Sequence, residues 1–97
     1  MTEEKYFIQW ERLIATLSLL QVPVWVEVHP DRAARIISFR TLRRHQDMLW
    51  TALVSLKLWR AKLTSPDDTS LVEYEVSLNR FAGWPRDKTI YNLNPDR

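Results

Sequence analysis

The sequence contains no cysteine, and this absence removes several kinds of chemistry. Without thiols there is no disulfide, no thiolate metal site and no cysteine nucleophile. A cysteine-free chain fits a reducing compartment. Glu3 and Glu4 precede the first apolar residues, whereas a secretory signal begins with basic residues. We therefore expect a cytoplasmic protein.

Glycine is almost as scarce, since Gly83 is the only one among 97 residues. Glycine-rich phosphate loops need several positions at which the backbone approaches a phosphate closely, so nucleotide chemistry of that kind is excluded. The strained serine turn of the α/β-hydrolases is absent as well. Because the usual parts of covalent catalysis are missing, we expect neither an enzyme nor a cofactor.

Long apolar runs are also missing. The longest, from Leu13 to Leu20, is interrupted by Thr16 and Ser18, and a membrane span needs about 20 apolar residues. The composition, 45% hydrophobic and 27% charged, is that of an ordinary folded domain. No repeat or linker divides the chain, so we predict a single domain over residues 1–97 with no membrane contact, frayed at residues 94–97.

Positive charge is concentrated in the middle of the chain, although the net charge is only +2. Residues 32–62 contain eight basic side chains and one acidic one, whereas residues 1–31 and 63–97 are each net acidic. If the basic side chains converge in space, they would attract phosphate or an acidic protein surface.

Residues 41–63 carry the longest coherent pattern and predict a long central helix. At about 100° per residue, one broad face gathers Leu42, His45, Leu49, Ala52, Leu53, Leu56 and Leu63. A second apolar strip consists of Trp50, Val54, Leu58 and Ala61. A helix that is apolar on two sides needs two neighbours. We expect it to be sandwiched within the monomer or to bury one strip against a partner, such as a second copy.

The first part of the chain predicts a helix followed by a hairpin. Apolar residues recur at helical spacing over residues 3–20, and Pro23 ends that helix. Valines then alternate with other residues over 22–28, which is typical of a strand that begins at Pro23 or lies at a sheet edge. Residues 35–40 favour a returning strand. The alternative is a helix that starts at Pro30 and continues into the central helix.

Residues 53–78 are compatible with two different structures. Ser65, Pro66 and Asp68 form a helix-start signature, and Gly83 is a typical residue beyond a helix end. This pattern favours a further helix after the central one. The alternation around Glu73 allows a β-hairpin instead.

In the hairpin alternative, residues 53–63 pair with the second strand, with Arg60 opposite Glu73 and Trp59 opposite Tyr74. A short strand near residues 89–92 could join the valine strand. The predicted fold is thus a small α+β domain with an N-terminal helix, a short antiparallel hairpin or sheet, a long central helix, and a further helix or β-hairpin after it.

Two His-x-Asp motifs are the strongest candidates for a metal site. They are His29-Pro-Asp31 and His45-Gln-Asp47, whose imidazoles and carboxylates would suit zinc. The motif is short, and the copies are 16 residues apart. A surface turn and a helix flank explain these residues better, so we predict no metal site.

Tryptophan is abundant, with five residues in 97. Most are expected in the core, but Trp50 lies on the second strip of the predicted helix, and tryptophan is enriched at interfaces. We therefore predict a non-enzymatic interaction or regulatory protein. It would act by binding a protein partner or itself, as a homo-oligomer, through Trp50, Val54 and Leu58.

The alternative function is a nucleic-acid-binding regulator that uses the basic block 32–62. Arg40, Arg43, Arg44 and Lys57 would contact phosphates while Trp50 stacks on a base. The sequence contains no zinc-finger spacing and no aromatic strand motif of an RNA-recognition fold. Basic residues can equally form a solvated face.

Overall fold

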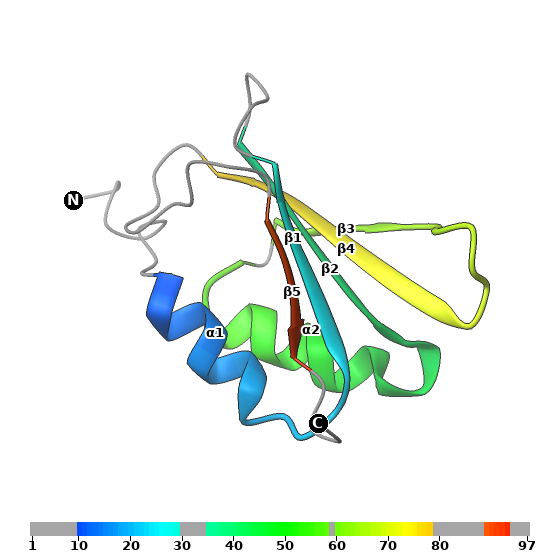
Figure 1. The fold of residues 1–97 in the computed structure, drawn as a ribbon, viewed down its shortest axis with the longest axis horizontal. Coiled ribbons are helices and arrows are strands. Elements are labelled where there is room, and N and C mark those ends of the chain that lie inside the picture. The colour runs from blue at the N-terminus through cyan, green and yellow to red at the C-terminus, as the bar shows by residue number, and fades with distance from the viewer. Residues whose placement is uncertain (1–9, 30–34, 59, 79–88, 94–97) are drawn as a thin grey trace.

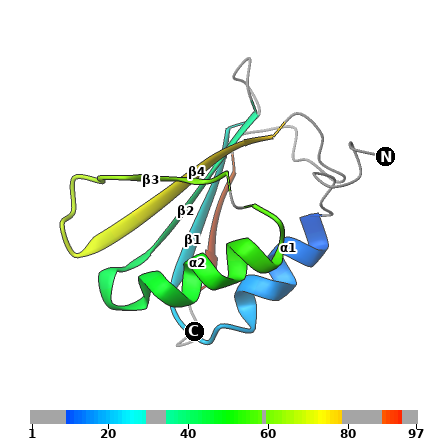
Figure 2. The same cartoon turned by 180° about the vertical axis from the view of Figure 1, so that it is seen from behind.

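The chain folds around a five-stranded antiparallel sheet with the strand order β3-β4-β2-β1-β5. The computed structural model describes residues 10–29, 35–58, 60–78 and 89–93. The elements are α1 (Trp10–Ser18), β1 (Val24–His29), β2 (Arg35–Leu42), the 3₁₀ turn η2 (Arg43–His45), α2 (Gln46–Ser55), β3 (Lys62–Thr64), β4 (Leu71–Leu78) and β5 (Thr89–Leu93). Both α-helices lie on one side of the sheet (Figures 1 and 2). Within the described ranges, no helix combines the length and apolarity needed to span a membrane.

The core lies between these helices and the sheet. Successive strand residues point to opposite faces, and the register places Val26 opposite Phe39 and Phe39 opposite Tyr74. All three side chains are buried, and α1 and α2 add Leu13 and Leu53 to the same cluster. Complete burial of one such apolar side chain contributes about 1.5 to 3 kcal/mol. The alternating valines of β1, which are Val24, Val26 and Val28, are fully buried in this layer.

The predicted hairpin is confirmed, because β1 and β2 pair in antiparallel register. The predicted strand at residues 89–92 is also present as β5, which pairs with β1. β1 therefore lies inside the sheet and not at its edge. Pro23 precedes the first residue of β1 and accepts a hydrogen bond from Thr41 Oγ1 at 2.7 Å. The missing N–H of this proline costs no ladder hydrogen bond there.

The predicted helix-rich layout is wrong, first because the long central helix over residues 41–63 does not form. Its first residues belong to β2 and η2, and α2 ends at Ser55. The N–H of Lys57 donates to Val54 O at 2.9 Å, and the N–H of Leu58 donates to Leu53 O at 2.8 Å. These two bonds form a Schellman motif, with Lys57 in the left-handed region at φ 64°.

Burial of Leu58 explains why the helix ends there. In a continuing helix Leu58 would lie on the strip that faces away from the core. After the reversal its side chain is only 2% exposed, and Ala61 is buried as well. Transfer of these apolar groups from water opposes the cost of a left-handed lysine, which is about 1 to 2 kcal/mol.

The second error concerns the further helix, because residues 71–78 form β4. Asp68 Oδ1, which was expected to support a helix start, instead accepts hydrogen bonds from the backbone N–H and the Oγ of Ser70. Such a bond stabilises a turn between β3 and β4. The β-hairpin alternative was right about the strand at residues 71–78 but wrong about its partner, because residues 53–55 belong to α2 and the partner strand is β3. Its register was wrong as well, because Leu63 lies opposite Tyr74 and Thr64 opposite Glu73.

Several sequence predictions lie outside the described residues. They are the helical residues before Trp10, a helix start at Pro30, the position of Trp59, the cap at Gly83 and the state of residues 94–97.

Replacement of Lys57 by glycine should stabilise the protein. Glycine adopts a positive φ without a Cβ clash, so we expect Lys57→Gly to raise the free energy of unfolding by about 1 kcal/mol, or roughly 4 to 8 °C in Tm. Urea and thermal unfolding would measure this. The control, Lys57→Ala, removes the same charge but keeps the Cβ, and should give no gain. Equal effects of the two variants would contradict the left-handed cap.

Candidate functional site

A groove of about 370 Å³ lies between the first turns of α2 and the β3–β4 hairpin. It is lined by Gln46, Asp47, Trp50, Ala61, Leu63 and Tyr74. The rings of Trp50 and Tyr74 stack with their centroids 5.3 Å apart and their planes at 27°. The groove therefore has an aromatic floor with polar side chains beside it.

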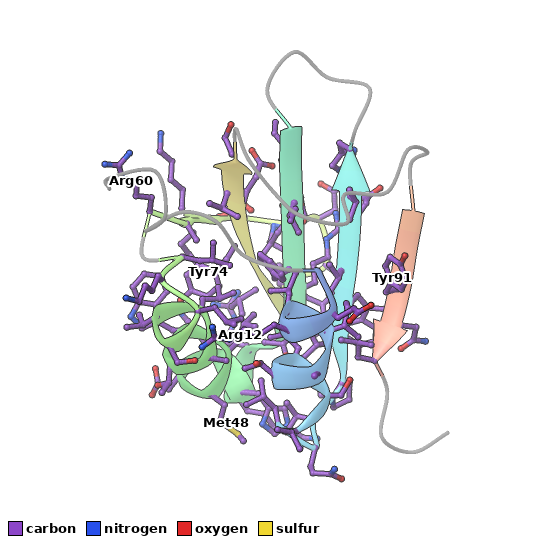
Figure 3. All side chains as sticks on the ribbon, turned by 90° about the vertical axis from the view of Figure 1, so that its left-hand side faces the viewer. Arg12, Met48, Arg60, Tyr74 and Tyr91 are labelled. Atoms are coloured by element: carbon purple, nitrogen blue, oxygen red, sulfur yellow. The ribbon has the colours of Figure 1, made fainter. Side chains whose placement is uncertain are left out.

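Three elements position these side chains. Tyr74 points from β4 to the helix side of the sheet, where Figure 3 shows it near α2. Gln46 Nε2 donates to the Tyr74 hydroxyl at 3.1 Å, which ties the first turn of α2 to the sheet. Trp50 lies one turn further along α2 and stacks on the same ring. The two aromatic rings are thus fixed by contacts between α2 and β4 in the absence of a ligand.

Leu63 forms the exposed wall of the groove. It lies directly opposite Tyr74, yet 57% of its surface is accessible to solvent. β3 is the last strand on its side of the sheet, and among the described strands it pairs only with β4. An extended peptide could pair with the outer edge of β3 and place alternate side chains against Leu63 and Trp50.

The predicted partner strip does not form one surface. Trp50 lines the groove and is half-buried, and Val54 is 41% exposed one turn further along α2. Leu58 lies beyond the end of α2, in the core. A single strip would need a helix that continues past residue 55, whereas the chain reverses at Lys57.

Sequence reasoning missed the groove residues Gln46, Asp47, Leu63 and Tyr74. The predicted long helix places Leu63 on its core face, whereas Leu63 is exposed on β3. The useful signal was the alternation of Val72, Tyr74 and Val76, which marks Tyr74 as facing the core.

The four basic residues of the nucleic-acid alternative lie in three parts of the fold. Arg40 is on β2, where it forms an ion pair with Glu73. Arg43 and Arg44 lie in η2, and Arg43 Nε donates to Thr69 O at 3.1 Å. Lys57 follows the other end of α2, and ten helical residues span about 15 Å. These four basic residues of the block 32–62 therefore do not form one compact basic patch.

The sheet face opposite the helices carries a polar network centred on Glu73. Arg40 Nε donates to Glu73 Oε2, and Thr64 Oγ1 donates to Glu73 Oε1 at 2.7 Å. Burial raises the pKa of Glu73, but the hydrogen bonds from Thr64 and Arg40 and the charge of Arg40 outweigh it and lower the pKa overall. The network links β2, β4 and β3, and thereby holds the strand that forms the groove wall.

The two histidines do not meet. His29 ends β1 and lies 3.4 Å from Glu27, whereas His45 lies in η2, beyond the opposite end of the β1–β2 pair. Asp31 is outside the described residues. Within the described part of the chain, no group of three or more histidine or acidic side chains could hold a metal ion.

No protein-family model matches the chain, and no match was found among curated proteins or solved structures.

Loss of the Glu73 carboxylate should make stability less sensitive to acid. Because the folded-state pKa is lowered, this carboxylate contributes stability above its unfolded pKa, and the contribution is lost as the pH falls through the folded pKa. We expect Glu73→Gln to lower the free energy of unfolding by about 1 to 2 kcal/mol at pH 7, and the two proteins to converge in acid. Urea unfolding over a pH series measures this.

The matched control is Glu75→Gln, two residues along on the same face of β4. It removes an equal charge without breaking the bonds to Arg40 and Thr64, so its effect should be smaller. A constant difference between Glu73→Gln and the wild type at every pH would contradict the assignment.

Proposed function

We propose that this chain is a non-enzymatic binding protein that holds an extended segment of a protein partner in the groove between α2 and β3. The segment would pair with the outer edge of β3 and insert an apolar side chain over the Trp50–Tyr74 floor. The observation that carries the proposal is the exposed Leu63 beside a stacked aromatic pair at a sheet edge.

Energetics favour a protein segment as the ligand. An apolar side chain buried against Leu63 and Trp50 would contribute about 1.5 to 3 kcal/mol, and main-chain hydrogen bonds to β3 would add affinity that depends little on sequence. The floor is already held by the Gln46–Tyr74 hydrogen bond, so binding needs little ordering of the groove.

Polar groups beside the groove would orient the segment. Asp47 lies in the first turn of α2 and is exposed. Its carboxylate could accept a hydrogen bond from a donor next to the apolar anchor, and a lysine or arginine there would add a charge interaction. We further propose that the protein works in the cytoplasm, because a cysteine-free chain suits a reducing compartment.

Selection from a displayed library of random peptides would test this function. We expect the enriched peptides to share an apolar anchor in an extended, proline-poor stretch, and to shift the backbone amide NMR signals of β3 together with the Trp50 indole signal. Leu63→Glu should weaken their binding by about tenfold or more, because a carboxylate replaces the apolar wall.

The matched control is Leu19→Glu, which introduces the same change after the end of α1 at a residue that is 78% exposed. It should leave peptide affinity unchanged. Peptides that bind Leu63→Glu as tightly as the wild type, or a selection that enriches none, would overturn the proposed groove.

A further inference from the structure

The two outer edges of the sheet are built differently. β3 has three residues, one of which is Lys62, whereas β5 has five residues, Thr89–Leu93, and no charge. Soluble proteins protect exposed edges by shortness, charge, proline or bulges, because an open ladder recruits another strand. β3 is both short and charged, which disfavours pairing with the long edge strand of another sheet but leaves room for a short segment anchored in the groove. The uncharged β5 has neither of these protections.

β5 is also held ready for pairing. It is hydrogen-bonded to β1 along its whole length, with Val24 opposite Leu93 and Val28 opposite Thr89. Its backbone is therefore already extended, so a further strand would not have to order it. No described strand pairs with its outer edge.

The side chains of β5 gain burial if another strand is added. Ile90 is 65% exposed on the face opposite the helices. Tyr91 and Leu93 point to the helix side, where they are half-buried against the core. Figure 3 shows Tyr91 at the β5 margin, far from Tyr74. A neighbouring strand would cover apolar surface on both faces.

We propose that a second copy of the chain pairs with β5 through an antiparallel two-fold axis centred on Tyr91, so that two sheets join into one of ten strands. Ile90 would then face Asn92 of the second copy, and Thr89 would face its Leu93. No charged residues meet, and the Tyr91–Tyr91 pair on the axis is an aromatic pair of the kind that stabilises antiparallel ladders. The strand is thus complementary to itself, as a two-fold interface requires. Both grooves would remain open at the far ends of the dimer.

The solution mass tests this assembly. Light scattering on the wild-type chain should give twice the 11.6 kDa monomer mass at high concentration. The double variant Ile90→Lys with Asn92→Lys should be monomeric, because both positions are exposed and lysines on an edge oppose pairing. Circular dichroism would check that the variant remains folded.

Leu63→Lys is the matched control, since it places a lysine at an exposed site on the opposite edge. Leu63→Lys should still have the mass of a dimer but should bind the peptides selected for the groove more weakly. The β5 double variant should bind those peptides with wild-type affinity. Failure of the β5 dimer can therefore be distinguished from failure of the proposed peptide groove. A monomeric wild type, or a dimer that persists in the folded double variant, would overturn pairing through β5.

Because the chain has no cysteine, one introduced thiol reports directly on the geometry. Tyr91→Cys lies on the proposed axis and should form a covalent dimer on mild oxidation, since directly opposed Cα atoms of an antiparallel pair are about 4.5 to 5.5 Å apart, within the span of a disulfide. Leu63→Cys should remain largely uncrosslinked under the same conditions. Equal crosslinking of the two variants would contradict the proposed axis.

Discussion

The end of α2 is the constraint on which the rest of the structure depends. The Schellman bonds at Lys57 and Leu58 reverse the chain and bring Leu58 into the core. Residues that could have prolonged the helix instead form β3, which pairs with β4. This reversal places Leu63 opposite Tyr74 and creates the groove beside Trp50. Burial of two apolar side chains, Leu58 and Ala61, outweighs both the regular helix and a left-handed lysine.

The two faces of the sheet carry different kinds of side chain. The helix face is apolar and supplies most of the stabilisation, whereas the other face joins Arg40, Glu73 and Thr64 in a polar network. That network explains part of the basic block, since Arg40 has an acidic partner 33 residues away in sequence. Charge counted along the chain therefore overstates the charge available at one surface.

The two edges of the sheet are suited to different proposed partners. At the β3 edge a short strand stands beside an aromatic floor, which suits capture of a small extended segment. At the β5 edge a longer uncharged strand suits pairing with an equal strand. Because the sheet separates the two edges by three internal strands, occupation of one need not obstruct the other.

Local pattern alone predicted the elements that depend on neighbouring residues, although it left a helix from Pro30 open as an alternative to β2. The valine alternation of β1, its hairpin with β2, the helix over residues 10–18 and the strand at β5 follow from spacing and turn residues. Within the candidate site, the sequence identified Trp50 as a residue of interest. These features depend on interactions between residues that are close in the chain, so they can be predicted without knowledge of the tertiary structure.

Only the tertiary structure decided residues 53–78, because helix and strand periods both fit them. The register that puts Leu63 opposite Tyr74 depends on burial of Leu58 and on the pairing of β4 with β2. These are contacts between residues far apart in sequence, and their free energy exceeds the local propensities that favoured a long helix. The groove consists of such contacts, which is why the sequence predicted one of its aromatic residues but not its shape.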